Sequence, residues 1–254
     1  YRNVPYHNFF HAVDACQTIR TFIFDGKLQD FLTELECFVL LITALVHDLD
    51  HMGLNNSFHL KTDSPLGILS SASGNNSVLE VHHCNLAIEI LEDPKSNVFI
   101  GLDAGNAKLA YRGLIDCVLA TDMARHNELL EDFTKATPTL SKDNAEHRTF
   151  AMKMVMKAAD ISNVTKPFAV SKKWAMAVTE EFYQQGDKEK ASGVDVLPMF
   201  DRSANNELAK GQIGFINFIC IKYFTAIATA FDGLQWTIEN VQSNLERWKS
   251  EVAH

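Results

Sequence analysis

The segment His47-Asp48-Leu49-Asp50-His51 most constrains how this chain can fold, because it sets imidazoles and carboxylates within an apolar, helical stretch. His7 and His11 upstream and Asp160 downstream extend the same pattern. Burying such groups is costly unless hydrogen bonds or a cation compensate them. The chain must therefore fold around a charged or metal-binding centre.

Apolar residues recur at helical intervals along the chain, and strand signals are almost absent. Residues 33–36 have the form of a capping box, which predicts a helix that ends at His47 and Asp48. Residues 77–80 suggest a second capping box, before a helix that carries His82 and His83. Further helices are expected at about 107–126, 144–160, 171–185, 207–231 and 235–250, with loops at 70–76, 131–143 and 186–210. We expect one all-α domain over residues 1–254.

Composition narrows the class of protein. With 46% hydrophobic and 22% charged residues, the chain can build a sizeable core. A net charge of -9 argues against nucleic acid as a partner. The five cysteines are odd in number and widely spaced, which favours a reducing, cytoplasmic location. The longest apolar stretch is interrupted by Asn217 and Lys222, so we expect no membrane span.

Histidine spacing points to metal binding. Helical positions i and i+4 share a face, so His7 should project with His11, and His47 with His51 if the helix continues. Imidazole nitrogen and carboxylate oxygen suit zinc at ~2.0–2.2 Å, and one carboxylate can bridge two ions ~3.5–4 Å apart. One histidine alone would more often be an ordinary core or surface residue. The combination favours an open catalytic site, in which Asp160 is either a ligand or simply a turn residue.

The sequence from His47 to Phe58 resembles, position by position, the signature of class I cyclic-nucleotide phosphodiesterases. The likeness continues through segments in family order: 6–11, 78–83, 120–123, 159–167, 180–187 and 212–216. It is most similar to the kinetoplastid cAMP-specific branch. It implies a compact, multi-helix, HD-type metal-dependent phosphohydrolase domain whose N-terminal helices are truncated here.

The resemblance also implies roles at the metal centre. His11, His47, Asp48 and Asp160 would hold Zn²⁺, with Asp48 bridging to Mg²⁺ or Mn²⁺. His7 would be the general acid that protonates the O3′ leaving group. Glu80 would orient His7, with helix capping as an equally weighted alternative. Two further histidines would join the water network near the second ion: His51 and His83.

At the substrate end, the resemblance implies that Gln212 hydrogen-bonds the purine edge while Phe215 and Val178 pack on its faces. Without the resemblance, Phe215 and Val178 would be read as core. Asn163 favours cAMP, with cGMP as a possible second substrate. The other residues expected to line the pocket are Tyr6, Met123, Ile161, Phe182 and Met199, with a flexible rim at 199–210.

Two other functions remain open from the residues. A different phosphohydrolase with His-Asp metal ligation, such as a nucleotidase, would share the metal ligands but would not need Gln212 and Phe215. A catalytically inactive cyclic-nucleotide sensor would keep the pocket but not the chemistry. The oligomeric state is left open.

Overall fold

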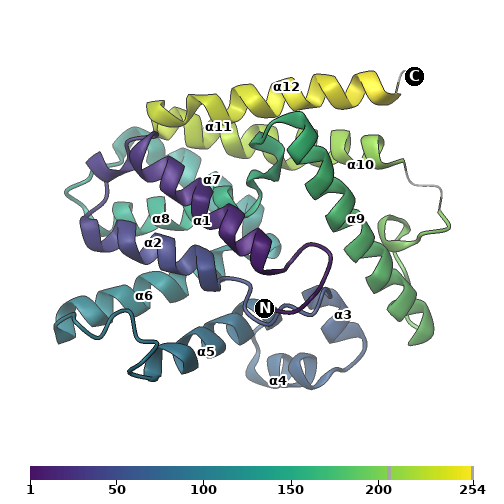
Figure 1. The fold of residues 1–254 in the computed structure, drawn as a ribbon, viewed down its shortest axis with the longest axis horizontal. Helices are drawn as coiled ribbons and strands as arrows, with labels where there is room; N and C mark the ends of the chain where they lie inside the picture. The colour runs from purple at the N-terminus through teal and green to yellow at the C-terminus, as the bar shows by residue number, and fades with distance from the viewer. Residues whose placement is uncertain (205–206, 253–254) are drawn as a thin grey trace.

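The computed structural model describes residues 1–204 and 207–252, and within them every regular element is helical (Figure 1). The all-α expectation is confirmed. The α-helices are α1 Phe9–Phe24, α2 Glu34–Val46, α3 Asn56–Lys61, α4 Pro65–Ser73, α5 Val78–Glu92, α6 Ala104–Ala120, α7 His126–Ala136, α8 Ala145–Asp160, α9 Phe168–Ala191, α10 Leu208–Phe215, α11 Ile221–Ala230 and α12 Gln235–Val252. A π-helix, Ile216–Cys220, joins α10 to α11. Short 3-10 turns occur at Leu28–Asp30, Met123–Arg125, Thr137–Thr139, Ser162–Thr165, Pro198–Phe200 and Asp232–Leu234.

Helix capping accounts for several boundaries. The capping box at Thr33 is present, with Glu36 as its reciprocal partner. The second predicted box is wrong, because the Ser77 side chain makes no cap hydrogen bond to α5. The Ser77 hydroxyl donates instead to Asp122 Oδ2 at 2.6 Å. A local sequence pattern could not anticipate this long-range acceptor.

The predicted loops are partly wrong. Helix α4 continues through Ser73, and α7 with the turn Thr137–Thr139 occupies much of the expected loop 131–143. Helix α9 extends to Ala191, and α10 begins at Leu208, so the long loop is shorter than expected. Residues 205–206 of that loop and of the expected rim lie outside the described residues. Polar, turn-forming residues predict loops in these segments, but tertiary packing overrides that local preference and the segments are helical.

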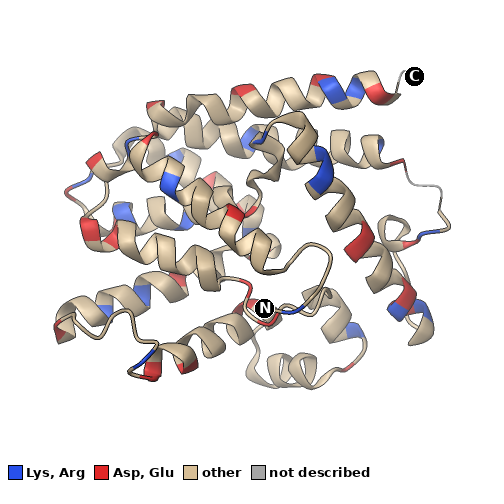
Figure 2. Cartoon of the chain, viewed as in Figure 1, with Lys and Arg blue, Asp and Glu red and all other residues tan. Residues whose placement is uncertain are grey.

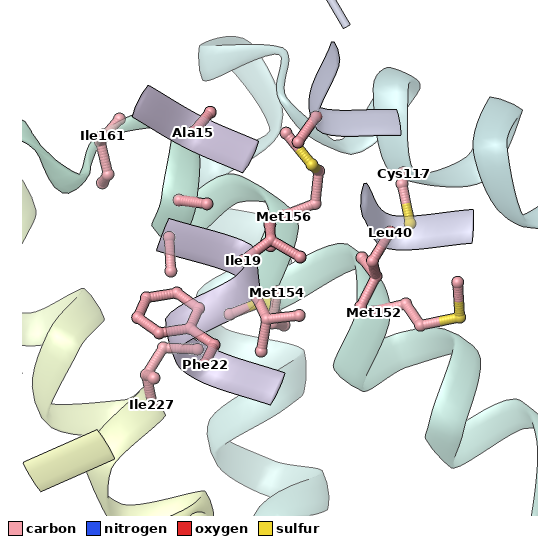
Figure 3. Close-up of a cluster of buried hydrophobic side chains, with 14 of the residues drawn as sticks. Ala15, Ile19, Phe22, Leu40, Cys117, Met152, Met154, Met156, Ile161 and Ile227 are labelled. Atoms are coloured by element: carbon pink, nitrogen blue, oxygen red, sulfur yellow. The ribbon is translucent and has the colours of Figure 1, made fainter. Parts of the chain in front are cut away.

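The core forms around α8. Helices α1 and α2 pack on each other and on α8, α6 packs on α2 and α8, and α11 contacts α8 from the other side. Figure 3 shows Ile19 and Phe22 of α1 beside three α8 methionines, with Leu40 and Ile227 closing the cluster. The side chains of Ile19, Phe22, Leu40 and Ile227 are fully buried. The core thereby fixes how α1, α2 and α8 lie relative to one another.

The outer surface carries charges of both signs. Figure 2 shows Lys and Arg interspersed with Asp and Glu along the helices, and the described residues in that view form no continuous basic stripe. This distribution agrees with the acidic net charge. It offers little support for binding a phosphate backbone.

The stretch Leu208–Ala230 is long and apolar enough to cross a membrane, judged by length and composition alone. Core helices of other proteins meet the same criterion. In this structure the stretch contributes Ile216, Cys220 and Tyr223, all fully buried, to the core that also contains α8. Helix α10 also packs on α12. The stretch is therefore part of the helical fold described here.

The segment after α9 folds back on that helix. Arg202 donates to Glu180 and Asp187, and the Phe200 ring lies edge-on to Phe182 at 5.1 Å between centroids. Gly186 allows this approach, because a Cβ there would collide with the carbonyl oxygen of Phe200. The segment that carries Met199 is therefore held against α9.

Substituting Gly186→Ala should destabilise the protein, because the methyl group displaces the Phe200 backbone. Overpacking of this kind costs about 1–3 kcal/mol, measurable as a lower free energy of unfolding in urea. The matched control is Gly214→Ala, where nothing lies within 4 Å of the added Cβ. Alanine there should be neutral or stabilising by about 0.5–1 kcal/mol. Equal effects of the two substitutions would contradict the packing account.

Candidate metal centre and adjoining pocket

Three helix ends bring the predicted metal ligands together. The Asn8 side chain accepts from the backbone N–H of Phe10 and His11, which starts α1 and places His11 in its first turn. Helix α2 ends at Val46, so His47 caps it and Asp48 follows the cap. Asp160 is the last residue of α8. These local starts and stops, together with the core packing, create the cluster.

The four side chains form a compact group of donor atoms. One ligand atom from each of His11, His47, Asp48 and Asp160 lies within 4.8 Å of all the others. His47 Nε2 is 3.3 Å from His11 Nε2, from Asp48 Oδ2 and from Asp160 Oδ1. All four residues are buried or nearly so. No other described group of this kind contains two carboxylates and two imidazoles.

The hydrogen bonds around the cluster show that its residues fit a cation. His47 Nδ1 lies 2.9 Å from the carbonyl oxygen of Ala44, so it carries a proton and leaves Nε2 with a lone pair in the neutral ring. Asp48 Oδ2 is buried and has no hydrogen-bond partner among the described residues. Lone pairs therefore face one another at the centre, and a metal ion would satisfy them. The donor set of nitrogen and oxygen suits zinc.

Without a cation, protons on the imidazoles would have to compensate the lone pairs that face one another in the cluster. Burial alone would lower the pKa of His11, but the neighbouring carboxylates of Asp160 and Asp48 raise it to about 9. The pKa of His47 is raised in the same way, against its burial, by Asp48 and Asp160. Burial would raise the pKa of Asp48, but the two imidazoles hold it well below its usual range. A metal ion at this position would displace protons.

His7 belongs to a second cluster. It precedes Asn8 and so lies outside α1, and the prediction that it shares a helix face with His11 is wrong. His7 Nδ1 is hydrogen-bonded to Glu181 Oε1, and Glu181 Oε2 accepts from the backbone N–H of His7 at 3.0 Å and of Tyr6 at 2.8 Å. The His7 ring stacks on His51 at 3.9 Å. Nδ1 is thereby occupied, which leaves His7 Nε2 for other partners.

The carboxylate that orients His7 is therefore Glu181, and the expectation for Glu80 is wrong. Glu80 Oε2 accepts from Asn56 Nδ2 at 2.9 Å. Burial, with Asp122 nearby, raises the pKa of Glu80 to about 7. For Glu181, burial would raise the pKa, but the hydrogen bond from His7 lowers it. Glu181 stood in the sequence within a family segment, but it lies 174 residues from His7, so no local spacing linked the two.

His51 and His83 lie beside the cluster of His11, His47, Asp48 and Asp160 and do not belong to it. Helix α2 ends at Val46, so the condition under which His47 and His51 would share a helix face is not met. The ring of His51 lies between His7 and His83, at 3.9 Å and 5.8 Å between centroids. His83 Nε2 is 3.7 Å from Asp48 Oδ1. Burial lowers the pKa of both imidazoles, that of His83 to about 4, so both are neutral at physiological pH.

A cavity of about 1010 Å³ adjoins the cluster. Asp48 and Asp160 line this cavity together with Gln212 and Phe215. Gln212 Oε1 is buried and has no hydrogen-bond partner among the described residues. Every residue expected to contact substrate lines the same cavity: Tyr6, Met123, Ile161, Asn163, Val178, Phe182, Met199, Gln212 and Phe215. Asp122 and Gln185 also line this cavity, although no sequence pattern predicts a role for either.

A buried cluster of imidazoles and carboxylates at helix ends, open to a large cavity, defines the class of HD-type metal-dependent phosphohydrolases. Residues 6–241 match the family model described as 3′5′-cyclic nucleotide phosphodiesterase, and the chain belongs to this family. The resemblance noted in the sequence is thereby confirmed.

Similar proteins include the human high affinity cGMP-specific 3′,5′-cyclic phosphodiesterase 9A, 35% identical over 231 residues, which are 91% of this chain and 38% of that protein. A cGMP-specific 3′,5′-cyclic phosphodiesterase of Drosophila melanogaster is 34% identical over 252 residues, covering 98% of this chain and 22% of that protein. The chain thus spans well under half the length of these relatives.

Two solved structures have the same fold. That of Leishmania LmjPDEB1 in complex with IBMX is 63% identical, with a TM-score of 0.98, and the match covers all of this chain and 76% of the other. The phosphodiesterase domain of Salpingoeca rosetta rhodopsin phosphodiesterase is 35% identical, with a TM-score of 0.91, covering 98% of this chain and 76% of the other. The first match supports the likeness to the kinetoplastid branch.

Substituting Asp48→Ala should deplete bound metal, because Asp48 supplies the oxygen that the described residues leave unpartnered. Elemental analysis of purified protein should find at least about one zinc equivalent in the wild type and little in the variant. His82→Ala is the matched control, since His82 bonds Asp50 outside the cluster. Unchanged metal content in Asp48→Ala would contradict the ligand assignment.

The raised pKa of Glu80 predicts a pH dependence of stability in metal-free protein. The folded state holds the Glu80 proton up to pH about 7, whereas the unfolded chain releases it near the model value of 4.5. Stability should therefore fall as pH rises through this window. Glu80→Gln should gain up to about 3 kcal/mol over the wild type between pH 4.5 and 8, since each pKa unit corresponds to about 1.4 kcal/mol.

Urea unfolding at both pH values, with a chelator present, measures this difference. The control is Glu239→Gln on the exposed face of α12. A parallel pH dependence in the Glu80→Gln variant and the wild type would rule out the burial of Glu80 as its cause.

Proposed function

We propose that this chain is the catalytic domain of a 3′,5′-cyclic-nucleotide phosphodiesterase that hydrolyses cAMP, with cGMP as a second substrate, to the 5′-monophosphate. The observation that carries the proposal is Gln212, whose buried amide oxygen lacks a partner among the described residues and lines the cavity that also contains Asp48 and Asp160. A purine edge offers the donor that this oxygen needs. Family membership supports the same reaction.

Different residues that line the cavity would bind the base and the phosphate of the substrate. Gln212 would bind the purine edge, with Phe215 and Val178 packing against the ring, and Asn163 lines the same cavity. Apolar side chains at that end exclude water from the base. The phosphate would then lie toward Asp48 and Asp160.

The metal centre would hold two ions. His11, His47, Asp48 and Asp160 would hold Zn²⁺, and Asp48 would share a second ion, Mg²⁺ or Mn²⁺, which prefers oxygen ligands and retained water. Bound there, the cations would act as Lewis acids and neutralise charge that develops on the phosphoryl oxygens.

His7 would donate a proton from Nε2 to the O3′ leaving group. The hydrogen bond between His7 Nδ1 and Glu181 orients the ring and leaves Nε2 as the nitrogen that can donate. Glu181 also fixes the backbone of residues 6 and 7 through their N–H groups. His51 and His83 stay neutral and would order water between His7 and Asp48.

The proposed function also bears on the domain organisation, the location and the partners of the chain. Residues 1–254 would act as one catalytic domain, because buried apolar side chains from α1 to α12 form one core cluster. We propose a cytoplasmic location, which suits five free cysteines. The expected partner is the small-molecule substrate, and neither nucleic acid nor a membrane has a place in the mechanism.

Hydrolysis of cAMP and cGMP, assayed side by side with Mg²⁺ or Mn²⁺, tests the proposal. We expect turnover of both, with a higher kcat/KM for cAMP. Preferential hydrolysis of 5′-AMP or deoxynucleoside triphosphates would indicate a different phosphohydrolase, and nucleotide binding without turnover would indicate a sensor. The curated relatives are named as cGMP-specific, so a strong preference for cGMP would overturn the role given to Asn163.

The variant His7→Ala isolates the general acid. It should lower kcat by about 10²–10⁴-fold while metal content stays near wild type, because His7 belongs to the second cluster. The control Asn3→Ala alters the same N-terminal segment at an exposed position and should leave kcat unchanged. Loss of metal from His7→Ala would contradict the division between acid and ligands.

A further inference from the structure

Lys157 is a fully buried cation that the proposed chemistry does not use. It lies on α8, one turn before Asp160. Its Nζ donates to the carbonyl oxygens of Thr121 at 2.9 Å and Asp122 at 3.2 Å, and approaches Met123 Sδ at 3.4 Å. All three partners belong to the turn that follows α6.

The end of α6 explains why an ammonium group is stable there. Helix α6 ends at Ala120 with Thr121 as its C-cap, and carbonyl groups at a helix C-terminus carry partial negative charge. Lysine is a suitable donor to such carbonyls. Burial lowers the pKa of Lys157 to about 8, with Asp160 and Asp122 opposing the decrease. The side chain therefore remains largely charged at neutral pH.

The turn held by Lys157 forms part of the cavity wall. Thr121, Asp122 and Met123 all line the cavity. Asp122 is tied at both oxygens, to Ser77 Oγ at 2.6 Å and to the backbone N–H of Ala124 at 2.8 Å. Met123 is 45% exposed, and methionine is an adaptable side chain. Its sulfur is held by Lys157 Nζ.

We propose that Lys157 is a positioning residue that holds the Met123 wall of the pocket in a fixed place relative to the metal ligand Asp160, and so sets the affinity for the nucleotide. This inference rests on the proposed function and deepens it. Lys157 does not line the cavity itself, so it acts through the turn. Helix α8 carries both Lys157 and Asp160. The position of the Met123 wall relative to the metal centre is therefore set by one helix.

The variant Lys157→Met tests the role. It keeps an unbranched side chain of similar length and removes the donor, which leaves the carbonyl groups of Thr121 and Asp122 unpaired. Steady-state kinetics should show a KM for cAMP raised about tenfold with kcat within about twofold, the pattern expected when substrate binding alone is weakened. Zinc content should stay at the wild-type value. Lys153→Met, a partly exposed position one turn earlier on α8, should change neither constant.

A double-mutant cycle with Met123→Ala separates positioning from general stability. Met123→Ala should also raise KM without lowering kcat. If Lys157 acts through this wall, the double variant should raise KM no further than the larger single effect, because residues that share one interaction are not additive. Additive effects on KM would overturn the proposal.

Three further outcomes also test the role of Lys157. A folded Lys157→Met variant with a wild-type KM, or one that loses kcat and zinc together, would overturn the proposal. If that variant cannot be purified, Met123→Ala decides alone, and an unchanged KM in it would overturn the role of the wall. Absence of hydrolysis by the wild type would contradict the proposed function instead. Titration of metal-free protein with cAMP then tests Lys157, since the variant should bind more weakly.

Discussion

The fold holds together imidazole nitrogens and carboxylate oxygens whose lone pairs would otherwise repel one another. His11, His47, Asp48 and Asp160 turn lone pairs toward one point, and charges left unpaired in such a site cost several kcal/mol each. Packing supplies the restraint: α1, α2 and α8 contact one another through an apolar core, and their termini meet at the cluster. The fold itself thus brings the four predicted metal ligands together.

Orientation, and not residue type, separates the histidines by role. His11 and His47 direct Nε2 toward carboxylate oxygens in the cluster. His7 directs Nδ1 to Glu181 and belongs to a separate group with Glu181 and His51. His51, buried between His7 and His83, has its pKa lowered by burial. The Asn8 cap separates the environment of His7 from that of His11, because His7 precedes α1 and His11 lies within its first turn.

The sequence predicted what depends on local patterns and on family likeness. Helical periodicity gave the all-α class, and the Thr33 box gave the start of α2. Long-range pairings could not be predicted: Ser77 bonds Asp122 and does not cap α5, Glu80 bonds Asn56, and Glu181 reaches His7 across 174 residues. In each case a distant partner competes with a local one, and only tertiary packing decides between them. The assignment of individual site residues remains a prediction.

The apolar stretch from α10 to α11 shows why hydropathy alone could not separate a core helix from a pocket wall. Gln212 and Phe215 line the cavity, whereas Ile216 and Cys220 are fully buried in the core. The π-helix between α10 and α11 widens the turn at this point, a change common at functional sites. A helix that serves core and cavity together must be apolar on both faces. Asn217 and Lys222 of this stretch are exposed, whereas the polar side chain of Gln212 is buried and lines the cavity, as expected of a residue that binds the ligand.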